Sequence, residues 1–209
     1  MENILVVGAN GATGKKIVNL LKVAPYFKPI AMVRKEAQLE QFKKEGVDTV
    51  LADLEEDVSH AVKHIDKIIF AAGSGGKKVI AVDQEGAKSL IDISIKANIK
   101  KFVMLSSMGA DKPEEAEDLK AYLKAKQEAD EYLKASSLNY TIVRPGSLNN
   151  AKGTGKISLK NHFEAHGTIS RDDVAQTLVQ SLHDDAGTHK TFEILQGDTP
   201  IGKALPSVS

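Results

Sequence analysis

Short runs of apolar, largely β-branched residues alternate with longer amphipathic segments along most of this chain. The short runs predict strands at 4–8, 29–33, 48–52, 67–72, 101–106, 140–144 and 191–195. The segments between them predict helices near 13–23, 36–45, 57–64, 80–98, 114–135 and 171–183. Nearly continuous apolar strands must be covered on both faces, and helical crossovers supply that cover. The alternation therefore predicts an α/β fold with a doubly wound parallel sheet.

The segment 147–169 interrupts this alternation, because it is polar and contains several glycines. We expect a loop there, with one short strand at most. No low-complexity linker divides the 209 residues, and a chain of this length can bury a substantial core. We therefore expect a single domain over residues 1–209.

The composition excludes several classes of function. The formal net charge is zero, so nothing in the overall electrostatics favours nucleic acid or an anionic membrane as a partner. The chain has no cysteine, which excludes disulfides, thiolate metal sites and cysteine nucleophiles. Its apolar runs are too short to span a bilayer, and no leader-like segment follows Met1. We expect a soluble cytoplasmic protein, a monomer or weak homodimer with a small-molecule substrate.

Three glycines follow the first predicted strand at a spacing of three, Gly8, Gly11 and Gly14, in the stretch VVGANGATGKK. Gly8 would permit a tight turn, Gly11 a close approach of the backbone to a pyrophosphate, and Gly14 close packing of the helix on the sheet. The N–H groups of residues 10–13 would then meet phosphates at the positive end of the helix dipole. This predicts a dinucleotide-binding loop.

A nucleoside-triphosphate loop is the main rival interpretation of these glycines. It would need a glycine where Ala9 stands, and a serine or threonine where Lys16 follows Lys15. The chain fails both requirements. A glycine-rich turn without a ligand stays open as the simpler alternative.

The end of the second predicted strand bears on the choice of cofactor. An acid there is the usual partner of the NAD ribose, but this chain reads AMVRK, with Arg34 and Lys35. A guanidinium can hold a 2′-phosphate by paired, charge-assisted hydrogen bonds, which favours NADP(H). The alternative is that both are solvated charges. Asp53 and Leu54 after the third strand are placed for the adenine edge, and 71–76 gives a second close backbone approach.

A second constellation lies around the fifth strand and the helix after it. Ser107 ends the strand, and Tyr122 and Lys126 lie one helical turn apart in the motif Y-x-x-x-K. An ammonium beside a tyrosine favours the phenolate form, so Tyr122 could exchange a proton with a carbonyl or hydroxyl. Ser107, or Ser106 in its place, could hydrogen-bond the same oxygen, and Lys126 could also hold the nicotinamide ribose.

The charge pattern of this helix gives the sharper signal. Leu119, Tyr122, Leu123 and Leu133 define an apolar stripe at about 100° per residue. Lys126 and Asp130 fall within that stripe, where a charge is costly unless it is paired. The structural alternative is a plain ion pair between Lys126 and Asp130.

The motifs as a set, including KKFVMLSS, YLKAKQEADEYLKASSLNYTIVRPGSL and ISRDDVAQTLVQSL, resemble the short-chain dehydrogenase/reductase superfamily. The resemblance is closest to its atypical NAD(P)-binding, epimerase/dehydratase-like or NmrA-like branch, and it implies a Rossmann-like fold. It also implies that Ser107, Tyr122 and Lys126 are catalytic. With the residues argued above, the implied cofactor-binding set is Gly8, Asn10, Gly11, Ala12, Thr13, Gly14, Arg34, Lys35, Asp53, Leu54, Ala71, Ala72, Gly73, Ser106, Lys126, Pro145 and Gly146. Ser170 resembles the cap of the closing helix.

Only about sixty residues follow the RPG motif, which is too few for the sizeable substrate domain of the extended members. We therefore expect an NADP(H)-dependent reductase of a small carbonyl, quinone-like or flavin compound, with a pocket formed by 74–82 and 147–168. His162 and His166 are candidates for its lining. Two alternatives stay open: a non-catalytic NADP(H) sensor, as in some NmrA-like relatives, and an epimerase or dehydratase that retains NAD.

The six histidines give no sign of a metal site in the sequence. His60 and His64 are four residues apart on a short predicted helix, but no third ligand stands at a metal-binding spacing. A solvated helix face explains that pair better. We expect no metal.

Overall fold

The computed structural model describes residues 1–73, 75 and 78–205, and its core is a nine-stranded sheet in the order β11-β8-β10-β6-β5-β4-β1-β2-β3. These strands are β1 (Glu2–Val7), β2 (Phe27–Val33), β3 (Asp48–Leu51), β4 (Lys67–Phe70), β5 (Lys101–Leu105), β6 (Tyr140–Pro145), β8 (Lys156–Lys160), β10 (Lys190–Gln196) and β11 (Thr199–Pro200). A second, small sheet pairs β7 (Ser147–Asn149) with β9 (Thr168–Ser170).

The helices are α1 (Ala12–Lys22), α2 (Glu36–Lys44), α3 (Ala87–Lys96), α4 (Lys120–Ala135), α5 (Arg171–Gln180) and α6 (Ile201–Ala204). A π-helical segment, Val79–Gly86, runs directly into α3. No helix in the described part of the chain is long and apolar enough to cross a bilayer.

The seven strands from β3 to β10 are parallel, and the order reverses between β1 and β4. This is a doubly wound, Rossmann-like sheet, as the alternation of strands and helices predicts. Ligands of such sheets bind at the carboxyl ends of the strands, in the crevice beside the point of reversal. We therefore expect a ligand-binding site at the carboxyl end of β1.

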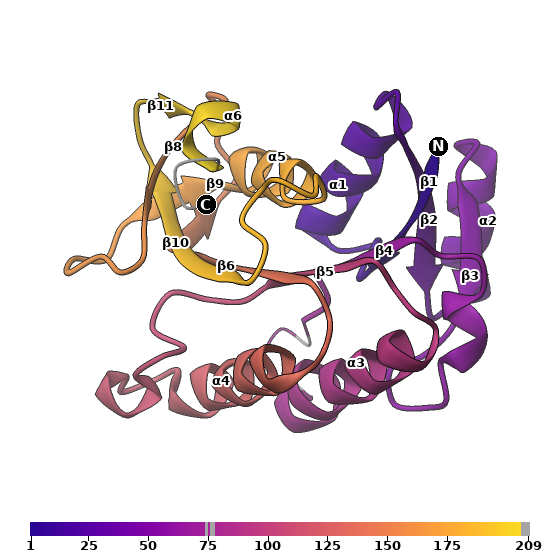
Figure 1. Ribbon diagram of the computed structural model, residues 1–209, viewed down its shortest axis with the longest axis horizontal. Helices are drawn as coiled ribbons and strands as arrows, with labels where there is room; N and C mark the ends of the chain where they lie inside the picture. Colours follow the sequence, from indigo (N-terminus) through magenta and orange to yellow (C-terminus); the bar gives the residue numbers. More distant parts are fainter. Residues whose placement is uncertain (74, 76–77, 206–209) are drawn as a thin grey trace.

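The period of two along each strand divides the core between two faces. Ile4 and Val6 belong to the cluster covered by α1 and α5, whereas Leu5 and Val7 belong to the cluster covered by α3 and α4. Figure 1 shows these helix pairs on opposite sides of the sheet. Because both faces are buried, the strands are apolar at nearly every position, as the sequence indicates.

Residues 147–169 and 57–64 form other elements than predicted. Residues 147–169 form three strands, β7, β8 and β9, rather than a loop with one short strand, and β8 runs antiparallel to β10 at the end of the sheet. Instead of a helix over 57–64 there is a single 3-10 turn, Ser59–Val62. Asp57 accepts hydrogen bonds from the Ser59 N–H and hydroxyl at 2.9 Å, and this local turn competes with a helix.

The predicted helix over 114–135 begins later than expected. Pro113–Glu115 is a separate 3-10 turn, and α4 starts at Lys120. Leu119 precedes the helix and is 58% exposed, so its assignment to the buried stripe was wrong. At the start of α5, Ser170 caps the helix by accepting from the Asp173 N–H, as expected.

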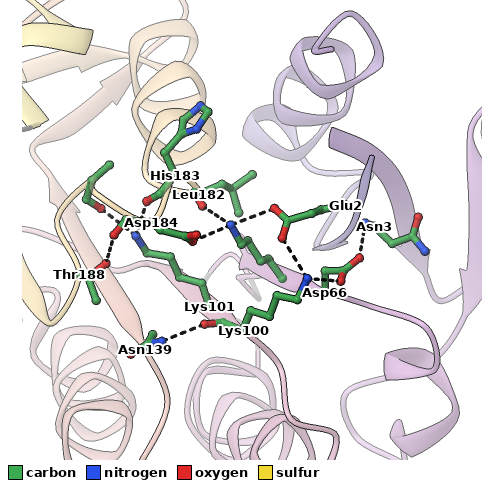
Figure 2. A network of polar contacts seen from close by, with 12 residues as sticks. Glu2, Asn3, Asp66, Lys100, Lys101, Asn139, Leu182, His183, Asp184 and Thr188 are labelled. Atoms are coloured by element: carbon green, nitrogen blue, oxygen red, sulfur yellow. Dashed lines mark hydrogen bonds and ion pairs between the residues drawn. The ribbon is translucent and has the colours of Figure 1, made fainter. Parts of the chain in front are cut away.

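The amino ends of β4 and β5 hold two buried lysines, Lys67 and Lys101. The Nζ of Lys101 donates to the carbonyls of His183 and Ala186 at 2.6 and 2.9 Å, and the Nζ of Lys67 donates to that of Leu182 at 2.9 Å (Figure 2). These carbonyls follow the end of α5, where helices leave acceptors unsatisfied. The two lysines thus fasten the segment after α5 to the amino ends of β4 and β5, opposite the crevice.

Candidate functional site

The loop after β1 needs its glycines for steric reasons. Gly8 has φ +83°, and a Cβ there would lie 2.7 Å from the carbonyl oxygen of Ala71. A Cβ on Gly14 would overlap the carbonyl oxygen of Gly8, because α1 starts directly against the loop. Gly11 is exposed, and a Cβ there would meet one described atom, the Gly8 oxygen at 3.2 Å. The backbone at Gly11 can thus be approached closely from outside.

The amino end of α1 is prepared for an anion. The first intrahelical bond runs from the Lys15 N–H to the Gly11 carbonyl at 2.9 Å, which leaves the N–H groups of residues 12–14 without an intrahelical acceptor. Within the described residues, no side chain caps this helix and no acid lies in its first turn. A phosphate group would supply the missing acceptors.

A cavity of about 360 Å³ opens at this loop. Nine of the predicted cofactor-binding residues line it, namely Gly8, Asn10, Gly11, Arg34, Asp53, Leu54, Ala71, Ala72 and Gly73. The predicted cofactor-binding set did not include the other lining residues, which are Val7, Met32, Val33, Gln38, Ala52, Lys78 and Val82. The cavity therefore extends from the glycine loop across the ends of β1, β2, β3 and β4. An elongated ligand with a pyrophosphate at the loop fits this arrangement.

Arg34 lies in the cavity wall just beyond β2 and is exposed. It forms no ion pair with any residue that the structure describes, so its guanidinium is available to a ligand. Lys35 is also exposed, but it is the N-cap of α2 and lies outside the cavity lining. Asp53 organises its own turn, since its Oδ1 accepts from the Glu55 N–H at 3.2 Å.

Lys78 is the most distinctive lining residue that sequence reasoning did not place here. Its Nζ pairs with Oε1 of Glu55 at 2.6 Å, so the start of the π-helical segment is tied to the loop after β3. The prediction assigned 74–82 to the substrate side, whereas Lys78 and Val82 line the cavity at the glycine loop. Residues 74, 76 and 77 of that segment lie outside the described residues.

The expected misplaced charge on α4 is present. Lys126 is buried, and its Nζ lies 3.3 Å from Oδ1 of Asp83 and 5.7 Å from the centre of the Tyr122 ring. The Nζ also approaches the carbonyl oxygen of Leu105, at the end of β5, to 3.5 Å. Tyr122 is half-buried. The two members of the Y-x-x-x-K motif thus lie side by side next to the carboxyl end of β5.

Asp130, the partner of Lys126 under the structural alternative, binds elsewhere. Its Oδ2 accepts from Nε of Arg144 at 2.9 Å and from the Ser106 hydroxyl at 2.8 Å. Complete burial raises the pKa of the Asp130 carboxyl, while the Arg144 guanidinium and the two hydrogen bonds oppose that rise. Lys126 pairs with Asp83 instead, so the structure has two separate long-range contacts in place of the i,i+4 ion pair of the structural alternative.

The remaining predicted residues lie outside the lining of the large cavity. Ser106 is buried and bonded to Asp130, whereas Ser107 is half-buried and donates to the Met108 carbonyl over a long 3.2 Å. Ala12, Thr13 and Gly14 form the first turn of α1. Pro145 ends β6, and a Cβ on Gly146, which follows it, would overlap the carbonyl oxygen of Gly167.

A second cavity, of about 120 Å³, lies on the α4 side. It is lined by Met108, Gly109, Asp111, Lys112, Glu115, Ala116, Leu123, His162, Phe163, Glu164 and His166. Both histidines predicted for the substrate side are among them. The cavity is thus formed between the segment after β5 and the loop that joins β8 to β9.

Asp83 is the polar residue that sequence reasoning missed, although a signal for it was available. It precedes Ala87, Leu90, Ile91 and Ser94 at helical spacing, and all five side chains are buried. The criterion that marked Lys126, a charge on an apolar helical face, also marks Asp83.

Fold, glycine loop and cavity together define a dinucleotide-binding α/β protein. A protein-family model described as NAD(P)H-binding matches residues 8–185. The chain belongs to this NAD(P)H-binding family.

Individual relatives agree with this assignment. The "Uncharacterized sugar epimerase YhfK" of Bacillus subtilis is 43% identical, over 97% of this chain and 98% of that protein. Among solved structures, the "Putative NAD-dependent epimerase/dehydratase from Bacillus halodurans" is 42% identical with a TM-score of 0.95, over 99% and 100% of the two chains. The oxidoreductase ylbE from Lactococcus lactis is 32% identical with a TM-score of 0.88, over 99% and 96%.

Proposed function

We propose that the protein is an NADP(H)-dependent oxidoreductase of the short-chain dehydrogenase/reductase type. Its substrate would be a small carbonyl, quinone-like or flavin compound. The observation that carries the proposal is the contact between Tyr122 and the buried Lys126, beside the strand ends that form the dinucleotide cavity. The similarity to a protein named an oxidoreductase supports the same class of chemistry.

Each member of the predicted catalytic set has a role that its surroundings support. The Tyr122 hydroxyl gives its proton to the substrate oxygen as negative charge develops there. The Lys126 ammonium stabilises the phenolate that remains, and Asp83 holds that ammonium in place. Ser107 exchanges its long bond to Met108 for a hydrogen bond to the same substrate oxygen.

A reduced nicotinamide dinucleotide, when bound, supplies the hydride that adds to the substrate carbon. The carbonyl double bond then becomes a C–H and an O–H bond, and the proton of the O–H bond comes from Tyr122. Solvent returns a proton to Tyr122, which is only half-buried. The Arg34 guanidinium lies in the cavity wall and pairs with no acid among the described residues, which supports a preference for the 2′-phosphate of NADPH.

The first experiment titrates the purified chain with NADPH and NADH, and then measures NADPH oxidation against aldehydes, quinones and flavins. Tyr122→Phe should lower turnover by about 100- to 10,000-fold and leave NADPH affinity within a factor of two. Tyr132→Phe is the matched control on the same helix, because the Tyr132 hydroxyl donates to half-buried Asp92 at 2.8 Å and Tyr132 lines neither cavity. It should keep full turnover.

The outcomes separate the alternatives. Tight NADPH binding with no turnover on any compound of the panel favours a dinucleotide sensor. The names of two relatives make an epimerase-type enzyme the second candidate. In that case the purified chain would release NAD on denaturation. Failure to bind either dinucleotide would overturn the proposed function.

A further inference from the structure

Three side chains from parts of the chain that are far apart in sequence meet beside the second cavity, and two of them, Asp111 and His162, line it. They are Asp111 in the segment after β5, His162 in the loop between β8 and β9, and Glu193 on β10. We propose that these three residues bind a divalent transition-metal ion, for which Zn²⁺ is the probe. This proposal does not rest on hydride transfer.

The distances suit one ion. The Nδ1 of His162 lies 3.6 Å from Oδ2 of Asp111 and 3.6 Å from Oε1 of Glu193, and the ligand atoms of all three lie within 4.8 Å of one another. Two ligands at 2.1 Å from a tetrahedral centre are about 3.4 Å apart. Small side-chain rotations would therefore complete the coordination. One imidazole with two carboxylates is a donor set that Zn²⁺ accepts, with a position left for water.

Glu193 gives the independent sign of a missing partner. Its side chain is 1% exposed, yet its Oε1 accepts no hydrogen bond from any described residue. A buried carboxylate oxygen without a donor is costly, and a metal ion would satisfy it. The other oxygen, Oε2, accepts from the Phe163 N–H at 2.6 Å. That bond fixes the orientation of the carboxylate, as outer-sphere hydrogen bonds do at metal sites.

The acidic groups near Arg144 also favour a cation at this place. Asp130 and Asp111 both approach Arg144, at 2.9 and 3.7 Å, and Glu193 lies beside Arg144 in the register of β10 and β6. Asp111 and Asp130 thus share one guanidinium, which Asp130 occupies mainly, and Glu193 stands at the neighbouring position of the next strand. A divalent ion between Asp111 and Glu193 would balance the two remaining charges. It could enter from solvent, because the His162 side chain is 48% exposed.

A bound ion would join the β8–β9 loop to the sheet at the rim of the second cavity. His162 belongs to that loop, while Glu193 belongs to the rigid sheet. Binding should therefore order the loop and stabilise the folded chain.

The test uses the full chain freed of metal by a chelator, with Zn²⁺ titrated calorimetrically and Co²⁺ followed by its visible spectrum. We expect one Zn²⁺ per chain, a thermal midpoint raised by about 4 °C at saturating Zn²⁺, and intense Co²⁺ bands of low coordination number. His162→Ala and Glu193→Gln should each weaken Zn²⁺ binding on the order of 100-fold. His166→Ala is the matched control, because His166 lines the same cavity without belonging to the three.

No Zn²⁺ heat and no Co²⁺ bands with the intact chain would overturn the proposal. So would Zn²⁺ binding that His162→Ala leaves unchanged, since it would then arise from other surface groups. His162→Ala carries the test if the buried Glu193→Gln variant fails to fold.

Discussion

The Nζ of Lys126 lies 3.3 Å from Oδ1 of Asp83, and the two side chains are 4% and 0% exposed. The pair joins α4 to the π-helical segment that carries part of the dinucleotide cavity wall. Removal of one partner of such a buried ion pair severely destabilises the folded protein, because the other charge stays buried and uncompensated.

Asp83→Asn and Lys126→Met should therefore each lower the free energy of unfolding by about 3–5 kcal/mol. The double variant should lose less than the sum of the two, with a coupling energy of about 1–3 kcal/mol. Urea denaturation of the four proteins measures this cycle. Additive losses would mean that the two charges do not stabilise each other.

Arg34→Ala should weaken NADPH binding by about 10- to 100-fold and change NADH binding less than threefold, because the guanidinium would bind only the 2′-phosphate. Lys63→Ala is the control, since Lys63 is also exposed but neither lines the cavity nor belongs to the predicted cofactor-binding set. Fluorescence titration gives all the affinities. Equal losses for NADPH and NADH in Arg34→Ala would refute the 2′-phosphate assignment.

Gly14→Ala and Gly11→Ala should separate folding from binding. A Cβ at Gly14 would overlap the backbone of Gly8 and Ala9, so we expect a loss of about 1–3 kcal/mol or more in the free energy of unfolding. A Cβ at exposed Gly11 meets only one described atom, at 3.2 Å, so stability should change little. Dinucleotide affinity should fall about tenfold in Gly11→Ala, because the methyl group stands where the backbone would approach a pyrophosphate. Thermal denaturation measures the stability of both variants, and titration with NADPH measures their affinity. Unchanged NADPH affinity in Gly11→Ala would contradict the predicted contact between the loop and the pyrophosphate.

Stability should depend on pH through Lys101. Burial lowers the pKa of its ammonium from 10.5 to about 8, and the charge of Lys67 acts in the same direction. Between these two values the unfolded chain binds a proton that the folded chain has released, so raising the pH favours the folded state. The relevant quantity is the difference in unfolding free energy between the natural chain and Lys101→Met. This difference should rise by up to about 1.4 kcal/mol per pH unit between pH 8 and 10.5.

Urea denaturation at several pH values measures this difference. Lys63→Met, at an exposed position, provides the reference for general effects of losing a positive charge. A difference for Lys101→Met that stays flat over this range would mean that Lys101 keeps its proton in the folded chain.

Much of the fold was readable in the sequence because the signals are local. The apolar run of β1 and the glycines after it depend only on near neighbours, so they predict both the strand and the turn at Gly8. Helical spacing likewise indicated that Lys126 and Asp130 face the core, and both are buried. Strand β8 was not predicted, because it is held by pairing with β10, which is distant in the sequence and leaves no local pattern.

Local sequence patterns are enough to predict the doubly wound sheet, the glycine loop and the burial of a lysine beside Tyr122. The partners of the buried charges, in contrast, depend on the tertiary structure. Lys126 and Asp130 share a helix face, yet each lies closer to a charge on another element, Asp83 or Arg144. Likewise, Asp111, His162 and Glu193 meet only because the chain returns to the same edge of the sheet after long intervals. Such contacts depend on the path of the whole backbone, which no spacing of residues along the chain records.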